Sequence, residues 1–104
     1  MTDPVRLGPV DQLVPGEGRA YAVDGAAVAV FLLADGTLRA VDAVCPHKGG
    51  PLADGQVDGR VVVCPLHAYA FSLDDGACTS AGVEPVGVHA VSVTAGMVTL
   101  RPRA

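Results

Sequence analysis

The sequence contains no tryptophan and few aromatic residues, which limits how its core can be built. Only 4% of the 104 residues are aromatic, whereas 50% are hydrophobic. Valine and alanine must therefore do most of the packing, and this favours thin layers of strands over a thick helical core. A chain of this length forms one domain, which we place at residues 1–104, and it is small enough to gain stability from a bound metal.

Long apolar runs and an excess of positive charge are also missing. No window approaches the ~20 apolar residues of a membrane-spanning helix, and the N-terminus lacks a basic region followed by an apolar stretch. Seven lysines and arginines against eleven acidic residues give a net charge of −4, which disfavours nucleic acid and anionic membranes as partners. We therefore expect a cytoplasmic protein with no nucleic-acid and no membrane partner.

Short strands separated by turns account for most of the chain. The turns include Asp35-Gly36, Asp58-Gly59 and Asp75-Gly76, and no segment has sustained helical periodicity beyond one possible turn at Val10–Val14. Regularly spaced strands with such turns indicate an all-β sandwich. The expected strands are Val5–Val10, Arg19–Val23, Ala26–Leu33, Thr37–Val41, Gln56–Val57, Arg60–Val63, Ala70–Leu73, Ala77–Thr79, Val88–Thr94 and Met97–Arg101.

Two short segments, Cys45-Pro-His47 and Cys64-Pro-Leu-His67, each pair a thiol with an imidazole. In a C-x-H segment the two side chains are too close to chelate one tetrahedral ion comfortably, because paired zinc ligands are usually two to four residues apart. A dinuclear iron cluster removes the difficulty, since the cysteine can hold one iron while the histidine reaches the other. A Cys2His2 zinc site with unusual spacing, in a zinc-binding interaction module, is the alternative.

The full segments, CPHKGGPL and CPLHAYAF, resemble the cluster-binding loops of the Rieske family. The resemblance implies one Rieske-type [2Fe–2S] cluster, in which two histidines replace two cysteines on one iron. Cys45 and Cys64 would bind the buried iron, and His47 and His67 the outer one. It also implies a Rieske-type antiparallel β-sandwich, with a cluster-binding subdomain inserted at about residues 42–73.

A Rieske centre transfers electrons, so the resemblance implies an electron-transfer component of an oxidoreductase that is not catalytic alone. High-potential relatives carry a serine two residues, and a tyrosine four residues, after the second ligand histidine, where this chain has Tyr69 and Phe71. Hydrogen bonds to cluster sulfurs raise the potential. We therefore expect a potential near the low end of the family range of about −150 to +300 mV.

The third cysteine and the first motif bear on the redox partner. Cys78 follows the Asp75-Gly76 turn and is expected to be a small buried hydrophobe rather than a ligand. Together with CPHKGGPL, this Cys78 is similar to the pattern of the small subunit of assimilatory NAD(P)H-dependent nitrite reductase, which implies the large subunit as partner. The alternative is a Rieske-type ferredoxin that takes electrons from a reductase and delivers them to an aromatic-ring dioxygenase, its terminal oxygenase.

Overall fold

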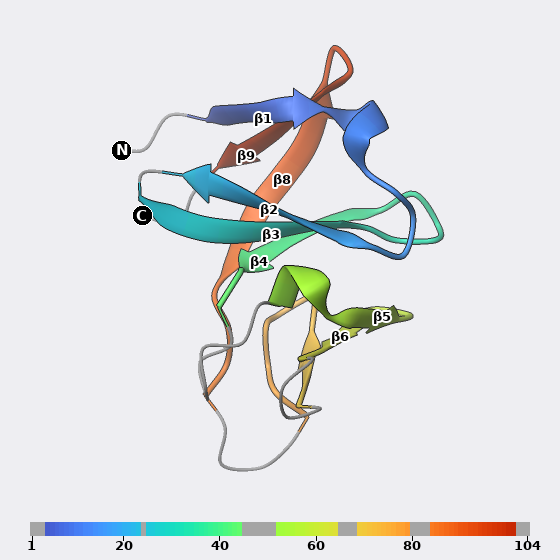
Figure 1. Ribbon diagram of the computed structural model, residues 1–104, viewed down its shortest axis with the longest axis vertical. Helices are drawn as coiled ribbons and strands as arrows, with labels where there is room; N and C mark the ends of the chain where they lie inside the picture. The colour runs from blue at the N-terminus through green and yellow to red at the C-terminus, as the bar shows by residue number, and fades with distance from the viewer. Residues whose placement is uncertain (1–3, 24, 45–51, 65–68, 80–83, 102–104) are drawn as a thin grey trace.

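A computed structural model describes residues 4–23, 25–44, 52–64, 69–79 and 84–101 of the chain. In these ranges it is built of short strands and two single-turn 3-10 helices, η1 and η2 (Figure 1). All pairings between named strands are antiparallel. The elements are β1 (Val5–Pro9), η1 (Val10–Gln12), β2 (Gly18–Val23), β3 (Ala26–Leu32), β4 (Leu38–Asp42), η2 (Leu52–Asp54), β5 (Gln56–Asp58), β6 (Val61–Val63), β7 (Ala70–Ser72), β8 (Val88–Thr94) and β9 (Met97–Arg101).

The strands form two sheets that lie one above the other. The larger sheet has the order β1-β9-β8-β4-β3-β2, and the smaller has the order β5-β6-β7. Figure 1 shows the larger sheet in the upper part of the molecule and the β5–β6 hairpin below it. The expected all-β fold of antiparallel sheets is therefore confirmed.

Strand β3 separates two hydrophobic cores, because both of its faces are buried. Val28 and Val30 belong to an upper core, whereas Ala29 and Phe31 belong to a lower core. The upper core also contains Leu13, Val23, Ala40, Val98 and Leu100; the lower core also contains Leu33, Val41, Ala43, Leu52, Ala53, Val62, Cys64, Phe71, Leu73 and Val86. The alternation of valine against alanine and phenylalanine in the sequence thus reflects two separate packing faces.

The final hairpin shows why the turns fall where the sequence places them. Strands β8 and β9 are joined by Ala95 and Gly96, whose φ angles are 52° and 78°. Two consecutive residues with positive φ make the type of turn that matches the twist of a two-residue hairpin. Glycine adopts this conformation without steric cost, which favours such a turn at an Ala-Gly pair.

The expected strand at Ala77–Thr79 is the one that the structure does not contain. Cys78 forms only an isolated bridge with Phe71, supported by hydrogen bonds from Ser72 N–H to Ala77 O (2.8 Å) and from Thr79 N–H to Ala70 O (2.8 Å). The pairing is too short to continue the ladder of the small sheet. The single helical turn expected at Val10–Val14 is confirmed by η1, whereas η2 was not predicted from the sequence. In the described ranges, no helix has the length and apolarity needed to span a bilayer.

Candidate metal centre

Of the four predicted ligands, the structure describes Cys64. Cys45, His47 and His67 lie outside the described residues. The site is therefore defined by the residues that flank the first motif segment (residues 45–51) and the second motif segment (residues 64–68).

Cys64 lies immediately after β6 and is 1% exposed. Its backbone N–H donates to the carbonyl oxygen of Tyr69, with a distance of 2.8 Å between nitrogen and oxygen. This hydrogen bond joins the two ends of the second motif segment, just before β7 begins. The Cys64 thiol is thus held inside the lower core rather than at the surface.

The ends of the first motif segment are joined in a similar way. Leu52 N–H donates to Ala43 O at 2.7 Å, and Ala43 N–H donates to Ala27 O at 3.0 Å. Leu52 is fully buried and Ala43 nearly so. The chain therefore leaves the larger sheet at the end of β4 and returns, through η2, to a point beside its departure.

Both motif segments begin and end at the same hydrophobic core. Ala43, Leu52 and Cys64 are buried members of the lower core, and Tyr69 packs against it. Residues that are distant in sequence are thereby brought together at one end of the fold. This convergence would allow ligands from two segments to bind a single metal centre.

Gly55 allows the chain that follows the first motif segment to pass close to β6, the strand that precedes Cys64. A Cβ atom at this position would overlap the carbonyl oxygen of Val63 and lie 2.9 Å from Val62 Cγ2. Only glycine therefore allows the backbone after η2 to pack directly on β6. No local pattern in the sequence reveals this close approach.

Asp42 fixes the end of β4, three residues before Cys45. Its Oδ1 lies 2.7 Å from His89 Nε2, and its Oδ2 accepts the Gly87 N–H at 3.1 Å. Its own N–H donates to Gly87 O at 2.9 Å. The His89 side chain is only 10% exposed and lies within hydrogen-bonding distance of Asp42. Sequence reasoning missed the role of Asp42.

A network of ion pairs links the larger sheet to the smaller one. Arg39 Nε lies 2.9 Å from Asp74 Oδ1, and Arg60 lies 3.2 Å from Asp74 and 3.3 Å from Asp35. The hydrogen bond from Arg39, followed by the charge of Arg60, lowers the pKa of Asp74. Hydrogen bonds from Thr37, helped by the charge of Arg60, lower the pKa of Asp35. These groups lie at the surface, where they join the larger sheet to the smaller one.

Cys78 lies beside β7, outside the two motif segments. It is partly buried, packs against the lower core and pairs with Phe71 on β7. This position agrees with the expectation of a small hydrophobic residue, although its burial is incomplete. Cys64 is the more deeply buried of the two described cysteines.

The described residues fit an iron–sulfur cluster. A thiolate buried among apolar side chains is unfavourable without a nearby positive charge, which bound ferric iron would supply at Cys64. The surrounding core, including Leu52 and Phe71, excludes water from the cysteine side of the site. The two thiols and two imidazoles of the motifs are the donor set of a Rieske centre.

Comparison with known proteins identifies the family. The Rieske [2Fe-2S] domain family matches residues 3–90 of the chain. The anthranilate 1,2-dioxygenase ferredoxin subunit of Burkholderia cepacia is 32% identical over 93 residues, which cover 88% of this chain and 85% of the relative. A 3-ketosteroid-9-alpha-monooxygenase oxygenase component of Mycolicibacterium smegmatis is 38% identical over 72 residues, 69% of this chain. The chain spans only 18% of the length of that relative.

Two solved structures with the same fold are a nitrite reductase small subunit and a dioxygenase ferredoxin. The NADH-dependent nitrite reductase small subunit of Mycobacterium tuberculosis has a TM-score of 0.92 and 32% identity, covering 100% of this chain and 98% of that one. The ferredoxin of carbazole 1,9a-dioxygenase from Nocardioides aromaticivorans IC177 has a TM-score of 0.89 and 32% identity, covering 98% and 100%. This chain belongs to the Rieske [2Fe–2S] domain family, and that membership implies a Rieske-type [2Fe–2S] cluster.

Proposed function

We propose that Cys45, His47, Cys64 and His67 are the ligands of the cluster. The observation that supports this most directly is that both motif segments begin and end on the lower core, at Ala43–Leu52 and Cys64–Tyr69. The cysteines would bind the inner iron and the histidines the outer iron, as in the family pattern. The bound cluster accepts and releases one electron.

The chain's own residues would hold and shield this centre. Cys64, immediately after β6, places its thiol in a buried position, and Leu52 and Phe71 keep water away from it. Hydrogen bonds across the ends of both segments limit the movement of the backbone when the charge of the centre changes. We further propose that residues 1–104 act as one domain, with a cluster-binding subdomain at about residues 42–73.

Ligand substitution with analysis of metal and sulfide tests the ligand assignment. We expect two irons and two acid-labile sulfides per chain, and we expect Cys64→Ser to lose most of both, because metal binding and local folding are coupled. Cys78→Ala is the matched control, since it changes the other described cysteine and should leave both contents unchanged. Full iron and sulfide in Cys64→Ser would remove Cys64 from the ligand set. One zinc per chain without sulfide would support the zinc alternative instead.

The partner proposed for this cluster is the large subunit of a nitrite reductase. CPHKGGPL and Cys78 support this choice, as does the TM-score of 0.92 with a nitrite reductase small subunit. A terminal oxygenase, supplied by a reductase, is the second candidate, because a dioxygenase ferredoxin matches almost equally well with a TM-score of 0.89. Either partner would place the protein in the cytoplasm.

Reconstitution separates the two partners. The reduced protein would be mixed with a purified nitrite reductase large subunit in one arm and with a Rieske terminal oxygenase in the other. We expect rapid reoxidation in the nitrite reductase arm, followed as the return of the visible absorption of the oxidised cluster. Reoxidation only by the oxygenase would transfer the assignment to the ferredoxin class.

A further inference from the structure

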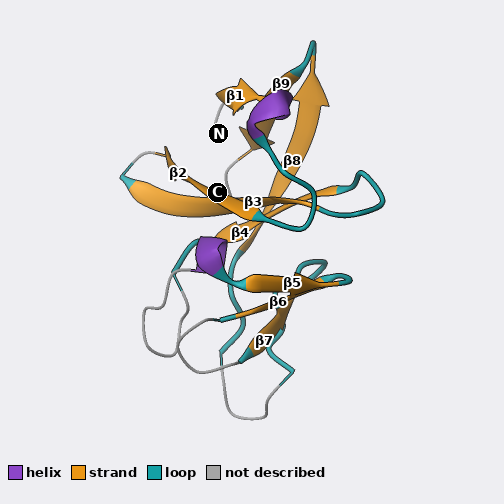
Figure 2. Ribbon diagram, turned by 45° about the vertical axis from the view of Figure 1, so that its right-hand side comes forward, coloured by secondary structure: helices purple, strands orange, loops and turns teal. Residues whose placement is uncertain are grey.

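Strand β8 has one edge that is free along its second half. On one side, β8 pairs with β9 from Ala90 to Thr94, but on the other it pairs with β4 only at Val88 and His89. Among the described residues, no other segment pairs with β8 beyond His89. Figure 2 shows this half of β8 continuing away from β4 toward the end of the molecule. A free sheet edge presents hydrogen-bonding groups to a further strand.

The hairpin geometry identifies which backbone groups face this edge. Thr94 and Met97 flank the two-residue turn and therefore form a hydrogen-bonded pair. Hydrogen-bonded and non-hydrogen-bonded pairs alternate along an antiparallel ladder, so the N–H and C=O groups of Val91 and Val93 point away from β9. Neither residue makes another backbone hydrogen bond within the described ranges. The Val93 side chain is also 45% exposed.

Other sheet edges carry features that oppose strand pairing, whereas this one does not. Strand β1 has an irregular register at Gly8 and ends at Pro9, β2 carries Arg19, and β5 has only three residues and ends in Asp58. Charges, prolines, irregularities and short length are the usual protections of an edge. The free half of β8, Ala90–Thr94, has neither a charge nor a proline, and its register with β9 is regular.

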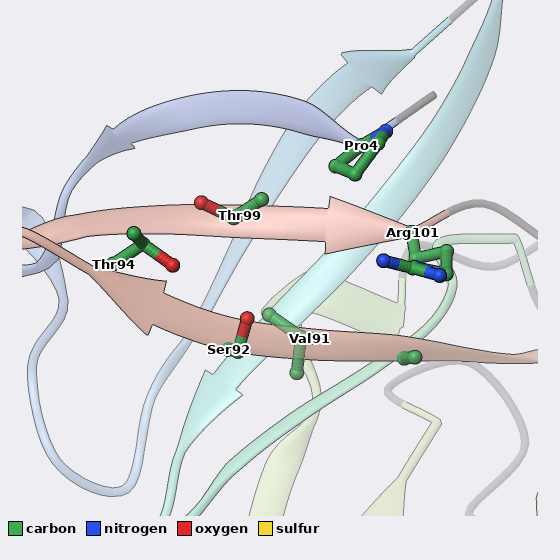
Figure 3. Close-up of a pocket in the computed structure, with 7 residues that line it drawn as sticks. Pro4, Val91, Ser92, Thr94, Thr99 and Arg101 are labelled. Atoms are coloured by element: carbon green, nitrogen blue, oxygen red, sulfur yellow. The ribbon is translucent and has the colours of Figure 1, made fainter. Parts of the chain in front are cut away.

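A groove with hydroxyl groups and an arginine lies on one face of the β8–β9 pair. Its volume is about 220 Å³, and Figure 3 shows Arg101 near one end of the strand pair, with the hydroxyls of Ser92, Thr94 and Thr99 distributed along it. Strands β1, β8 and β9 contain no aspartate or glutamate. A carboxylate that entered the groove would therefore meet donors without repulsion from these strands.

Two of the three arginines without an ion-pair partner among the described residues lie on the same part of the sheet. Arg39 and Arg60 are in ion pairs, and Arg19 lies over an aromatic ring at 5.8 Å. Arg6 on β1 and Arg101 on β9 have no ion-pair partner among the described residues. In a chain of net charge −4, two such arginines on adjacent strands favour an acidic partner.

We propose that the free edge of β8 binds an extended acidic segment of a partner protein by strand addition. The backbone of the segment pairs with Val91 and Val93, and carboxylates on alternate residues face Arg101. The edge lies at the opposite end of the molecule from β5–β7 and the ends of the motif segments (Figures 1 and 2). A partner held there leaves the cluster end accessible for electron transfer.

Titration of the isotope-labelled holoprotein with a defined peptide tests the proposal. The probe is a capped peptide of alternating glutamate and valine, and the readouts are amide shifts and hydrogen-exchange protection at Val91 and Val93. We expect saturable binding that weakens with salt, and at least tenfold weaker binding of the same peptide with lysine in place of glutamate. This comparison uses the unmodified protein, so it does not depend on the folding of any variant.

Two pairs of variants separate backbone pairing from charge. Val93→Pro removes an outward N–H that β9 does not use and should weaken binding at least tenfold, whereas Val93→Thr keeps the N–H and should bind normally. Arg101→Gln should weaken binding several-fold, whereas Arg19→Gln, with the same change of charge on β2, should not. Equal binding of both peptides, no binding, or unchanged affinity in a folded Val93→Pro would overturn the proposal. Dimerisation through β8, abolished by Val93→Pro, would replace the acidic segment with a second copy.

Discussion

At the scale of single residues, the side chains of Phe71 and Tyr69 bear on the reduction potential of the cluster. Phe71 is fully buried on β7 opposite Val62, and Tyr69 packs against the same core. Phe71 has no hydroxyl, so it cannot donate a hydrogen bond to a cluster sulfur. Such bonds stabilise the more negative, reduced state. Phe71 therefore supports a potential near the low end of the family range.

Restoring the hydroxyl tests this argument. We expect Phe71→Tyr to raise the reduction potential measured by protein-film voltammetry, because the added hydroxyl can donate to the cluster. Phe31→Tyr is the matched control, since Phe31 is an equally buried phenylalanine of the same core on β3. Equal shifts in both variants, or no shift in either, would show that position 71 does not control the potential.

At the scale of elements, the hydrogen bonds of Asp42 join β4 to β8. They hold the end of β4 from which the first motif segment departs, and they connect it to Gly87 and His89. Gly87 and His89 lie 45 and 47 residues after Asp42 in the sequence. We call these hydrogen bonds of Asp42 to Gly87 and His89 the Asp42 clasp. They couple the position of the first motif segment to the larger sheet.

Substitutions at His89 measure the contribution of this clasp. We expect His89→Leu to lower the free energy of unfolding by about 1 kcal/mol, toward the low end for a hydrogen bond to a charged group because the Asp42 side chain is 46% exposed. Loss of iron to a chelator should also be faster. His89→Gln keeps a donor near the position of Nε2 and should restore most of both properties. If Gln is no better than Leu, the hydrogen bond to Asp42 has no role in holding the segment.

The sequence predicts local features of the elements better than contacts between them. The expected strands at Ala26–Leu33, Val88–Thr94 and Met97–Arg101 are present as β3, β8 and β9, because each follows from the pattern of neighbouring residues. The expected strand at Ala77–Thr79 depends instead on a contact with β7, and there the pairing is limited to one bridge between Cys78 and Phe71.

The candidate site shows the same division. Its four proposed ligands follow from spacing within two motifs, whereas Gly55 and Asp42 act through contacts with β6 and β8 that no local pattern reveals.

At the scale of the whole molecule, the exposed ion pairs of Arg39 and Arg60 with Asp35 and Asp74 join the two sheets. The pKa values of both aspartates are lowered in the folded protein. Their contribution to stability is therefore present above the ordinary pKa of an aspartate, near 4, and is lost as the pH falls through the lowered values. The stability of the sheet arrangement should therefore depend on this network at neutral pH and should decline in acid.

Replacement of one shared carboxylate tests this dependence. Asp74→Asn should lower the melting temperature at pH 7 and flatten its decline as the pH falls below about 4. The difference from wild type should shrink in high salt, because exposed ion pairs are screened. Asp58→Asn is the control, since Asp58 is exposed on β5 and forms no ion pair among the described residues. The same effect in both variants would mean that net charge, not the network, is responsible.

The Rieske centre is tested most directly by pulsed electron paramagnetic resonance of the reduced protein labelled with nitrogen-15 in histidine. A cluster bound by His47 and His67 should show two strongly coupled imidazole nitrogens. One coupling should disappear in His67→Cys, and both should persist in His89→Gln, where the removed imidazole belongs to the Asp42 clasp. A reduced cluster without histidine nitrogen couplings, or one whose couplings are unchanged by His67→Cys, would contradict the proposed Rieske centre.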